Sequence, residues 1–357
     1  MFKINKNWVN DSSKIPEGYK QVQMLRQYSA DANEFDNEIK ANILLDNITR
    51  EDHNVWKDFQ PKFMLTYELI NYHEFFESCL YRVCEDYIKE LVCVCEYRHI
   101  FGMLLDENGP LSMEREMAIF KRVEQNIRKR YDRFRIKIIC CGLKILGVDH
   151  LKFQVKCLEE AADDVGQMIT GIDLVNEEDY HVKTNEFLEV IYGAKERFGD
   201  KLKVVLHAGE SNNRNNSELY DAVLLGAVRI GHGFNLAKHP KLIEMVKENN
   251  ICLECCPVSN KVLGYAHDYR CHPMRGLINR GVQCSISSDD QGFWQVKHLT
   301  YDYLIAYVAW DLTLSDIRRM VWNSIDYSTC SEEDKQIIKE WTRYKWIRFL
   351  EYVRGRY

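Results

Sequence analysis

The sequence predicts an α/β fold, a (β/α)8 barrel whose first strand is missing from this chain. Short, continuous apolar runs alternate with longer charged segments of helical period, which is typical of parallel strands buried on both faces. Polar residues end six of the seven runs, and in a parallel barrel the carboxyl ends of all strands meet at one mouth. A length of 357 residues is sufficient for one such domain.

The seven expected strands lie between residues 91 and 290. They are the runs Leu91–Arg98, Ile136–Leu143, Gln167–Val175, Lys203–Glu210, Ala227–Phe234, Asn250–Asn260 and Val282–Asp290. Repeated βα units can also form a doubly wound open sheet, but that fold concentrates its site residues at one crevice. Polar endings on nearly every strand therefore favour the TIM-type barrel. A closed barrel needs eight strands, and the best earlier apolar run, Asn42–Leu45, is short.

The regions flanking the strands divide the chain. Residues 1–55 are polar and weakly periodic, so we expect no long helix there and interpret them as a separate N-terminal segment. Apolar residues recur at helical spacing from Trp56 to Tyr87 and predict amphipathic helix at the start of a barrel domain, residues 56–357. The segment Glu332–Tyr357 predicts an outer or terminal helix, with a membrane-surface helix as the alternative.

Composition excludes several functions. The net charge of −6 gives no electrostatic reason to expect nucleic acid or an anionic membrane as a partner. The basic stretch Lys121–Lys137 is therefore interpreted as a solvated helix leading into a strand. The N-terminal residues contain no apolar signal-peptide core, and the chain has no apolar stretch long enough to span a membrane. Sequons at Asn10, Asn47 and Asn215 leave secretion open.

Most of the 13 cysteines lie inside apolar runs, where cysteine is usually a small buried hydrophobic residue. Cys252 and Cys255 have the C-x-x-C spacing of one type of zinc deaminase, which also uses H-x-E. No histidine in this chain is followed two positions later by glutamate. We therefore interpret these two cysteines as core residues.

Three strand ends carry residues suited to catalysis. They are His207-Ala-Gly-Glu210, Arg229-Ile-Gly-His232-Gly and Ser287-Ser-Asp289-Asp290. Taken singly, a histidine at a strand end is more often structural, and adjacent aspartates are often helix caps. Together they bring two imidazoles and three carboxylates to one mouth, which are the ligands and the acid–base groups of a zinc hydrolase.

These motifs resemble the adenosine deaminase family, and most closely its secreted growth-factor-like branch of the adenosine deaminase 2 type. The strongest matching stretches are His207–Glu210, Arg229–Phe234, Lys238–Pro240, Cys256–Asn260, Ser287–Asp290 and Asn323–Ser328. Weaker matches are Glu34–Asp36, Trp56–Phe59, Glu96–Arg98 and Gly171–Val175. The matches extend from about residue 33 to about residue 328, in the family's order.

The resemblance implies zinc-dependent hydrolysis of adenosine or 2′-deoxyadenosine to the inosine product and ammonia. His207 and Asp289 would be zinc ligands, and Glu210 would protonate a purine ring nitrogen. His232 would stabilise or deprotonate the attacking water, and Asp290 would hydrogen-bond a purine nitrogen and help to orient the hydroxide.

The resemblance also implies a nucleoside pocket. Trp56, Phe59 and Phe63 resemble the helix that walls this pocket, and Glu178 would contact the sugar. Asn176 stands where the family usually has glycine, so we expect its side chain to crowd the base.

One departure concerns the metal. The family's first barrel strand ends in H-x-H, which supplies two further zinc ligands, but no two of the 11 histidines here stand two positions apart. With two of four ligands, we expect little bound zinc and impaired activity. The missing strand, secretion signal and dimerisation region lead us to expect an N-terminally truncated form, in which residues 1–55 are a remnant of a family insertion and linker. The resemblance implies an extracellular location.

Three functions remain open from the sequence. The first is an adenosine deaminase truncated as an incomplete gene model, isoform or fragment. The second is a non-catalytic paralogue that binds a nucleoside or a receptor. The third is a related metal hydrolase for a different aminated base or nucleoside. The expected partner is a small-molecule nucleoside substrate, or a receptor for the non-catalytic paralogue alone, and neither nucleic acid nor a membrane is expected.

Overall fold

The structure is a computed structural model that describes residues 31–45, 55–296 and 298–356. Its centre is a seven-stranded, wholly parallel sheet with the strands in chain order. The strands are β1 (Val94–His99), β4 (Arg135–Leu143), β5 (Ile169–Val175), β6 (Lys203–Ala208), β7 (Arg229–His232), β8 (Cys252–Cys255) and β9 (Gln283–Ile286). The prediction of parallel strands in barrel order is confirmed, because five strands fall within their apolar runs and β1 and β4 extend beyond theirs by one residue each.

The sheet curls into most of a barrel, and ion pairs across its interior show this. Arg98 on β1 reaches Glu254 on β8, with Nη2 and Oε2 2.8 Å apart, although these strands stand first and sixth in the sheet. Arg229 on β7 contacts both Glu254 and Glu96, the latter on β1, at 2.6 and 2.5 Å. Such contacts require β1 and β8 to face each other across an enclosed space.

The barrel is open between β9 and β1, and no described residue forms a strand between them. Side chains bridge this side instead. Gln291 Nε2, beyond β9, donates to the Tyr87 hydroxyl 3.3 Å away, and the Thr300 backbone N–H donates to Glu90 at 2.9 Å. Within the described residues, the sequence prediction of seven strands rather than eight is therefore confirmed.

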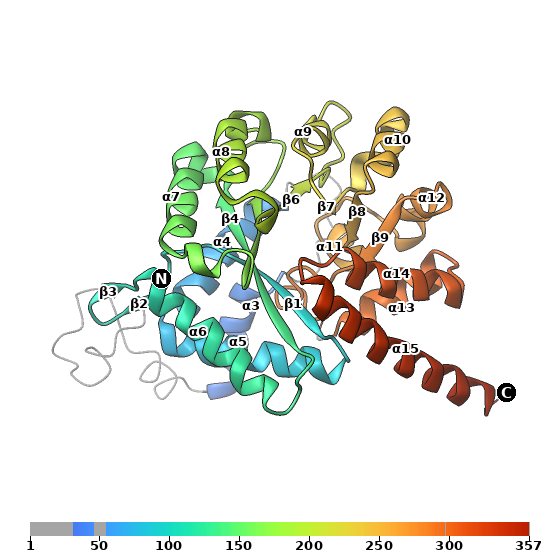
Figure 1. Cartoon of the computed structure of the whole chain (residues 1–357), viewed down its shortest axis with the longest axis horizontal. Coiled ribbons are helices and arrows are strands. Elements are labelled where there is room, and N and C mark those ends of the chain that lie inside the picture. The colour runs from blue at the N-terminus through green and yellow to red at the C-terminus, as the bar shows by residue number, and fades with distance from the viewer. Residues whose placement is uncertain (1–30, 46–54, 297, 357) are drawn as a thin grey trace.

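The helices of the described residues lie mostly on the outer face of the sheet, with α4 over the mouth (Figure 1). They are α3 (Ala32–Ile43), α4 (Trp56–Ile70), α5 (His73–Lys89), α6 (Met113–Arg128), α7 (Gly147–Glu160), α8 (Leu188–Phe198), α9 (Glu218–Leu224), α10 (Pro240–Glu248), α11 (Pro257–Val262), α12 (Met274–Asn279), α13 (Leu299–Ala309), α14 (Leu314–Asp326) and α15 (Glu332–Arg354). Two short strands, β2 (Leu105–Asp106) and β3 (Gly109–Pro110), form a hairpin. The basic stretch forms the end of α6 and leads into β4, as predicted.

Helix boundaries differ from the sequence prediction at three places. Helix α3 lies in the segment where we expected no long helix; Asp31 caps it by accepting from the Asn33 N–H at 2.7 Å. The Asn42–Leu45 run forms no strand: it ends α3, and the Leu45 N–H donates to the Phe293 carbonyl at 2.7 Å. The run Asn250–Asn260 turns helical at Pro257, a residue favoured at a first helical position because it needs no N–H partner.

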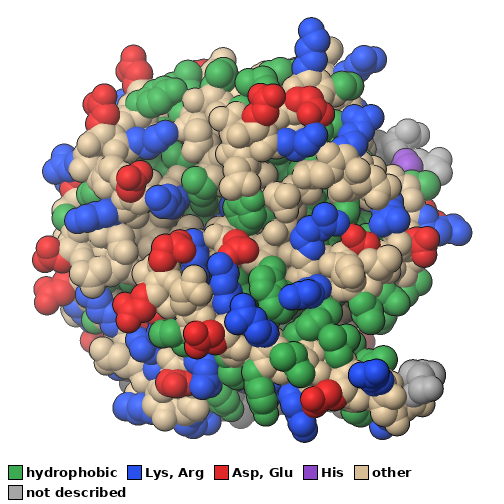
Figure 2. Space-filling view, turned by 45° about the vertical axis from the view of Figure 1, so that its right-hand side comes forward, with side chains coloured by type: hydrophobic (Ala, Val, Ile, Leu, Met, Phe, Trp, Pro, Cys, Tyr) green, Lys and Arg blue, Asp and Glu red, His purple; other side chains and the backbone are tan. Residues whose placement is uncertain are grey.

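The largest apolar cluster lies between the sheet and the surrounding helices, whereas the barrel interior combines ion pairs with a small apolar cluster of Ile139, Cys141 and Val205. Cys252 and Cys255 lie on β8 and are both fully buried, and all thirteen cysteines are free thiols. Cys93, in the apolar run Leu91–Arg98 where we expect cysteine to be buried, is only half-buried. No helix in the described part of the chain is both long and apolar enough to cross a membrane. Acidic and basic side chains are interspersed on the face shown in Figure 2.

Candidate active site

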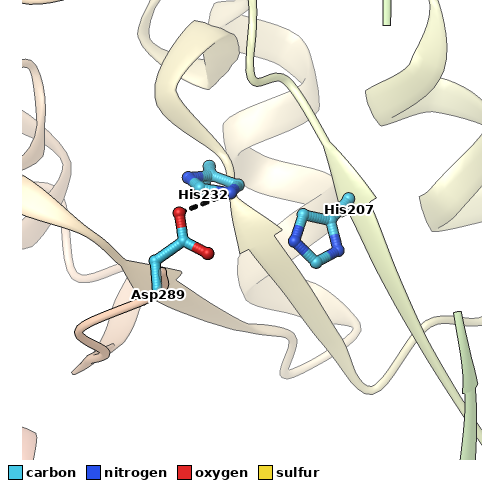
Figure 3. A group of neighbouring side chains, drawn as sticks. All are labelled: His207, His232 and Asp289. Carbon is cyan, nitrogen blue, oxygen red and sulfur yellow. Dashed lines mark ion pairs between the residues drawn. The ribbon is translucent and has the colours of Figure 1, made fainter. Parts of the chain in front are cut away.

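Three potential metal ligands converge at the carboxyl ends of the strands. His207 lies near the end of β6, His232 ends β7, and Asp289 follows β9. Each offers a ligand atom, and these atoms lie within 4.8 Å of one another. Figure 3 shows the Asp289 carboxylate directed at the His232 ring, whose Nε2 lies 3.9 Å from Oδ2. The sequence prediction that these strand ends meet is therefore confirmed.

The local sequence explains how these side chains approach one another. His232 and Asp289 adopt left-handed backbone angles, with φ of 62° and 55°. Such strain is characteristic of functional sites, because the surrounding fold must hold it in place. Gly231 has no side chain, and a Cβ there would lie 3.2 Å from the His207 ring. The glycine in the Arg229-Ile-Gly-His232 motif thus lets the two histidine-bearing strands pack closely.

Asp173, at the end of β5, orients His207. Its buried carboxylate accepts from His207 Nδ1 at 2.7 Å and from the His207 backbone N–H at 2.8 Å. Arg98 Nε also donates to it, at 2.7 Å. Because His207 Nδ1 is engaged, its Nε2 is the nitrogen available to a metal.

Two further carboxyl groups lie beside these ligands, the buried Glu210 and the half-buried Asp290. Glu210 is 4% exposed, and its Oε1 lies 3.5 Å from His232 Nε2. Burial is the main cause, and the charge of Asp289 the second, of a pKa of Glu210 that is raised well above its ordinary value. Burial and the same neighbour also raise the pKa of Asp290. A carboxyl group with a raised pKa keeps its proton to a higher pH and can then act as a general acid.

His232 differs from an exposed histidine in its protonation. Burial lowers its pKa to about 4, although the Asp289 carboxylate opposes this shift. The imidazole is therefore neutral at physiological pH. A neutral ring beside two carboxyl groups can donate or accept one hydrogen bond at the centre of the site.

Glu178 lies beneath the Gly209–Glu210 turn. Its carboxylate, 1% exposed, accepts from the backbone N–H groups of Gly209 and Glu210, each at 3.0 Å. Gly209 has a φ of 76°, which glycine adopts without strain. Glu178 thus holds the turn that carries Glu210, and its expected contact with a sugar stays a prediction.

The predicted pocket helix is α4, and its aromatic side chains cover the mouth. Phe59 is 1% exposed and packs against Phe293, with ring centroids 5.3 Å apart. Phe63 and Trp56 are half-buried, and Trp56 Nε1 donates to the Tyr265 hydroxyl at 2.9 Å. Phe59 therefore supports the wall from within the apolar cluster, while Trp56 and Phe63 keep some exposed surface.

Asn176 retains the backbone conformation expected of a glycine, with a φ of 98°. Its Nδ2 donates to Gln60 Oε1 on α4 at 3.1 Å. Its Oδ1 is buried and has no hydrogen-bond partner among the described residues. The side chain thus ties α4 to the end of β5, and whether it crowds a base stays a prediction.

Sequence reasoning assigned no role to two residues that build this site. Asp173 lies inside the weakly matching stretch Gly171–Val175, for which no role was expected, although a buried carboxylate near a histidine is a common orienting partner. Tyr265 carried no signal, because it lies in an irregular segment and contacts Trp56, more than two hundred positions away.

A curled parallel sheet with imidazoles and carboxyl groups at the carboxyl ends of its strands defines a (β/α)-barrel protein of the hydrolase type. The family model described as adenosine deaminase matches residues 36–343. Adenosine deaminase 2 of Sus scrofa is 32% identical over 84% of this chain and 61% of its own length. Adenosine deaminase 2 of Dictyostelium discoideum is 28% identical over 97% of this chain and 65% of its own length. The chain therefore belongs to the adenosine deaminase family.

Solved structures share the fold at low sequence identity. Arabidopsis ADAL complexed with IMP has a TM-score of 0.72 at 19% identity, covering 89% of this chain and 88% of that chain. An amidohydrolase from Burkholderia ambifaria with bound zinc has a TM-score of 0.74 at 15% identity, covering 94% and 87%. The chain spans less than two thirds of the length of the curated relatives described above.

Proposed function

We propose that this barrel, when loaded with metal, hydrolyses adenosine or 2′-deoxyadenosine to inosine or 2′-deoxyinosine and ammonia. The observation that carries the proposal is the convergence of His207, His232 and Asp289 at one mouth, with Glu210 beside them. Membership of the adenosine deaminase family supports the substrate class.

Each residue has a task in this reaction. Glu210, whose pKa is raised by burial and by the charge of Asp289, gives its proton to a purine ring nitrogen, which makes the adjacent C6 carbon more electrophilic. His232 hydrogen-bonds the water whose oxygen bonds to C6. One proton of that water passes to the amino group, which leaves as ammonia when the C6–N bond breaks, and the other proton returns to Glu210. Asp290 holds a second purine nitrogen, and Trp56 and Phe63 shield the base from solvent.

The residues present fit part of a zinc site. His207 Nε2 and the Asp289 carboxylate are donors that zinc accepts, and bound zinc would lower the pKa of a water molecule towards ~7. Catalytic zinc usually has three protein ligands and a water molecule. We therefore propose that residues 1–357 by themselves bind zinc weakly and turn over substrate poorly.

The test measures turnover and binding separately. Loss of adenosine is followed by ultraviolet absorbance with added zinc, with Glu210→Gln as the matched control. Any turnover should fall by roughly 10²–10⁴ in that variant, the usual contribution of a positioned acid. Calorimetry with 2′-deoxyadenosine reports binding.

The outcomes separate the candidate functions. Zinc-dependent turnover lost in Glu210→Gln supports the deaminase. Binding without turnover supports a nucleoside-binding paralogue, which the shortage of metal ligands also favours. Turnover of another aminated base alone supports a different metal hydrolase. If the chain shows no binding and no turnover, the proposal of a nucleoside site is refuted.

An extracellular location is proposed on the similarity to adenosine deaminase 2 proteins. The sequon at Asn215 is exposed, as glycosylation in a secretory compartment requires. A glycosidase-sensitive mass at Asn215 after expression in eukaryotic cells would support it, and an unmodified intracellular product would contradict it.

A further inference from the structure

The two site histidines each place one ring nitrogen in the site and bind the other to a buried partner. For His207 that partner is Asp173, which receives four donors: Arg98 Nε, His207 Nδ1, and the backbone N–H groups of His207 and Leu174. A carboxylate surrounded by donors can only accept. His207 therefore carries its ring proton on Nδ1, and its Nε2 keeps a free lone pair.

His232 has a different kind of partner, which belongs to a chain of hydrogen bonds. Its Nδ1 lies 3.1 Å from Asn260 Nδ2, and Asn260 Oδ1 lies 3.0 Å from His272 Nε2. An asparagine amide presents a donor at one end and an acceptor at the other, so its orientation decides which His232 nitrogen is protonated. Asn260 is fully buried, and His272 is 3% exposed.

A backbone N–H group fixes which atom donates in each of these hydrogen bonds. The Met274 N–H donates to His272 Nδ1 at 3.2 Å, and a ring nitrogen that accepts carries no proton. The His272 proton is therefore on Nε2 and is donated to Asn260 Oδ1. Asn260 must then present its NH2 group to His232, whose Nδ1 accepts. The His232 proton is left on Nε2, facing the site.

Packing holds His272 in this state. Its ring lies between Trp310 and Phe234, with ring centroids 4.9 and 5.0 Å away. Burial lowers the pKa of His272 to about 3, so the ring stays neutral and Nδ1 stays an acceptor. The direction of these hydrogen bonds is thus set by the Met274 backbone N–H group and by the burial of His272, with no contribution from a ligand.

We propose that Asn260 and His272 are positioning residues that hold His232 as its Nε2–H tautomer, while Asp173 holds His207 as the opposite, Nδ1–H tautomer. Of the three groups within ligand distance of one another, His207 and Asp289 then offer lone pairs, and His232 offers a hydrogen-bond donor. This donor faces Glu210 Oε1 at 3.5 Å and Asp289 Oδ2 at 3.9 Å. Its use in orienting water rests on the proposed function, but the tautomers do not.

The test is nuclear magnetic resonance of the protein labelled with ¹⁵N-histidine, because two-bond nitrogen–proton correlations show which ring nitrogen is protonated. His207→Gln and His232→Gln assign the two signals. The unmodified chain should show the proton of His232 on Nε2 and that of His207 on Nδ1. The opposite tautomer at His232 would overturn the proposal without any further variant.

Asn260→Asp tests the relay itself, because a carboxylate accepts where the amide NH2 donated. A proton should appear on Nδ1 of His232, while His207 stays unchanged. His150, whose Nδ1 accepts from the Leu143 N–H at 3.0 Å, should keep its tautomer and serves as an internal control. An unchanged His232 in a folded variant would overturn the relay. Neither measurement needs metal or substrate, so failure of the deaminase proposal would leave this test intact.

Discussion

Replacing Asp173 by asparagine should destabilise the barrel strongly, because its buried carboxylate accepts several hydrogen bonds at once. Its two oxygens accept four hydrogen bonds of 2.7–2.8 Å, and it pairs with the Arg98 guanidinium. An asparagine of the same shape places an NH2 group against two of these donors. Removing one partner of a buried ion pair costs ~3–5 kcal/mol. That is a large part of the ~5–15 kcal/mol that stabilises an ordinary domain.

Urea unfolding followed by tryptophan fluorescence and circular dichroism measures this loss. Asp163→Asn is the matched control: Asp163 is exposed, so its change should stay within ~0.5 kcal/mol. A double-mutant cycle with Arg98→Met should give a coupling of ~0.5–3 kcal/mol between residues 98 and 173. A loss below ~1 kcal/mol in Asp173→Asn, with an unchanged denaturant slope, would refute the reasoning.

Three further predictions follow from the same contacts. After dialysis, residues 1–357 should hold far less than one zinc per chain by elemental analysis; retention of a full equivalent would contradict this. Gly231→Ala should lower the free energy of unfolding by ~1–3 kcal/mol, because the added Cβ meets the His207 ring; an equally stable variant would show that the strands can separate. Burial raises the pKa of Asp302, which is fully buried, from 3.8 to about 7. The protonated Asp302 carboxyl therefore favours the folded state fully below about pH 4, and this contribution is lost as the pH rises to about 7. Relative to Asp302→Asn, the unmodified chain should lose up to ~4 kcal/mol over that interval in pH-dependent urea unfolding, and parallel curves would count against a buried, protonated Asp302.

The strands and their polar ends could be predicted from the sequence because their signals are local. A continuous apolar run such as Ile136–Leu143 identifies a strand buried on both faces, and β4 covers this whole run and begins one residue before it. His207, His232 and Asp289 could be placed at one mouth because parallel strands share one end. Helix α3 was missed because its apolar residues are few and its packing on α4 comes from outside the segment.

The sequence by itself determined the strand order, the family and the side chains available for catalysis, including the absence of any H-x-H pair. Only the tertiary structure decided what each histidine can do. The partners of His207 and His232 are Asp173 and Asn260, 34 and 28 positions away, on other parts of the barrel. The tautomer of a histidine is set by the hydrogen-bond partner of one ring nitrogen, and the spacing of residues along the sequence does not identify that partner.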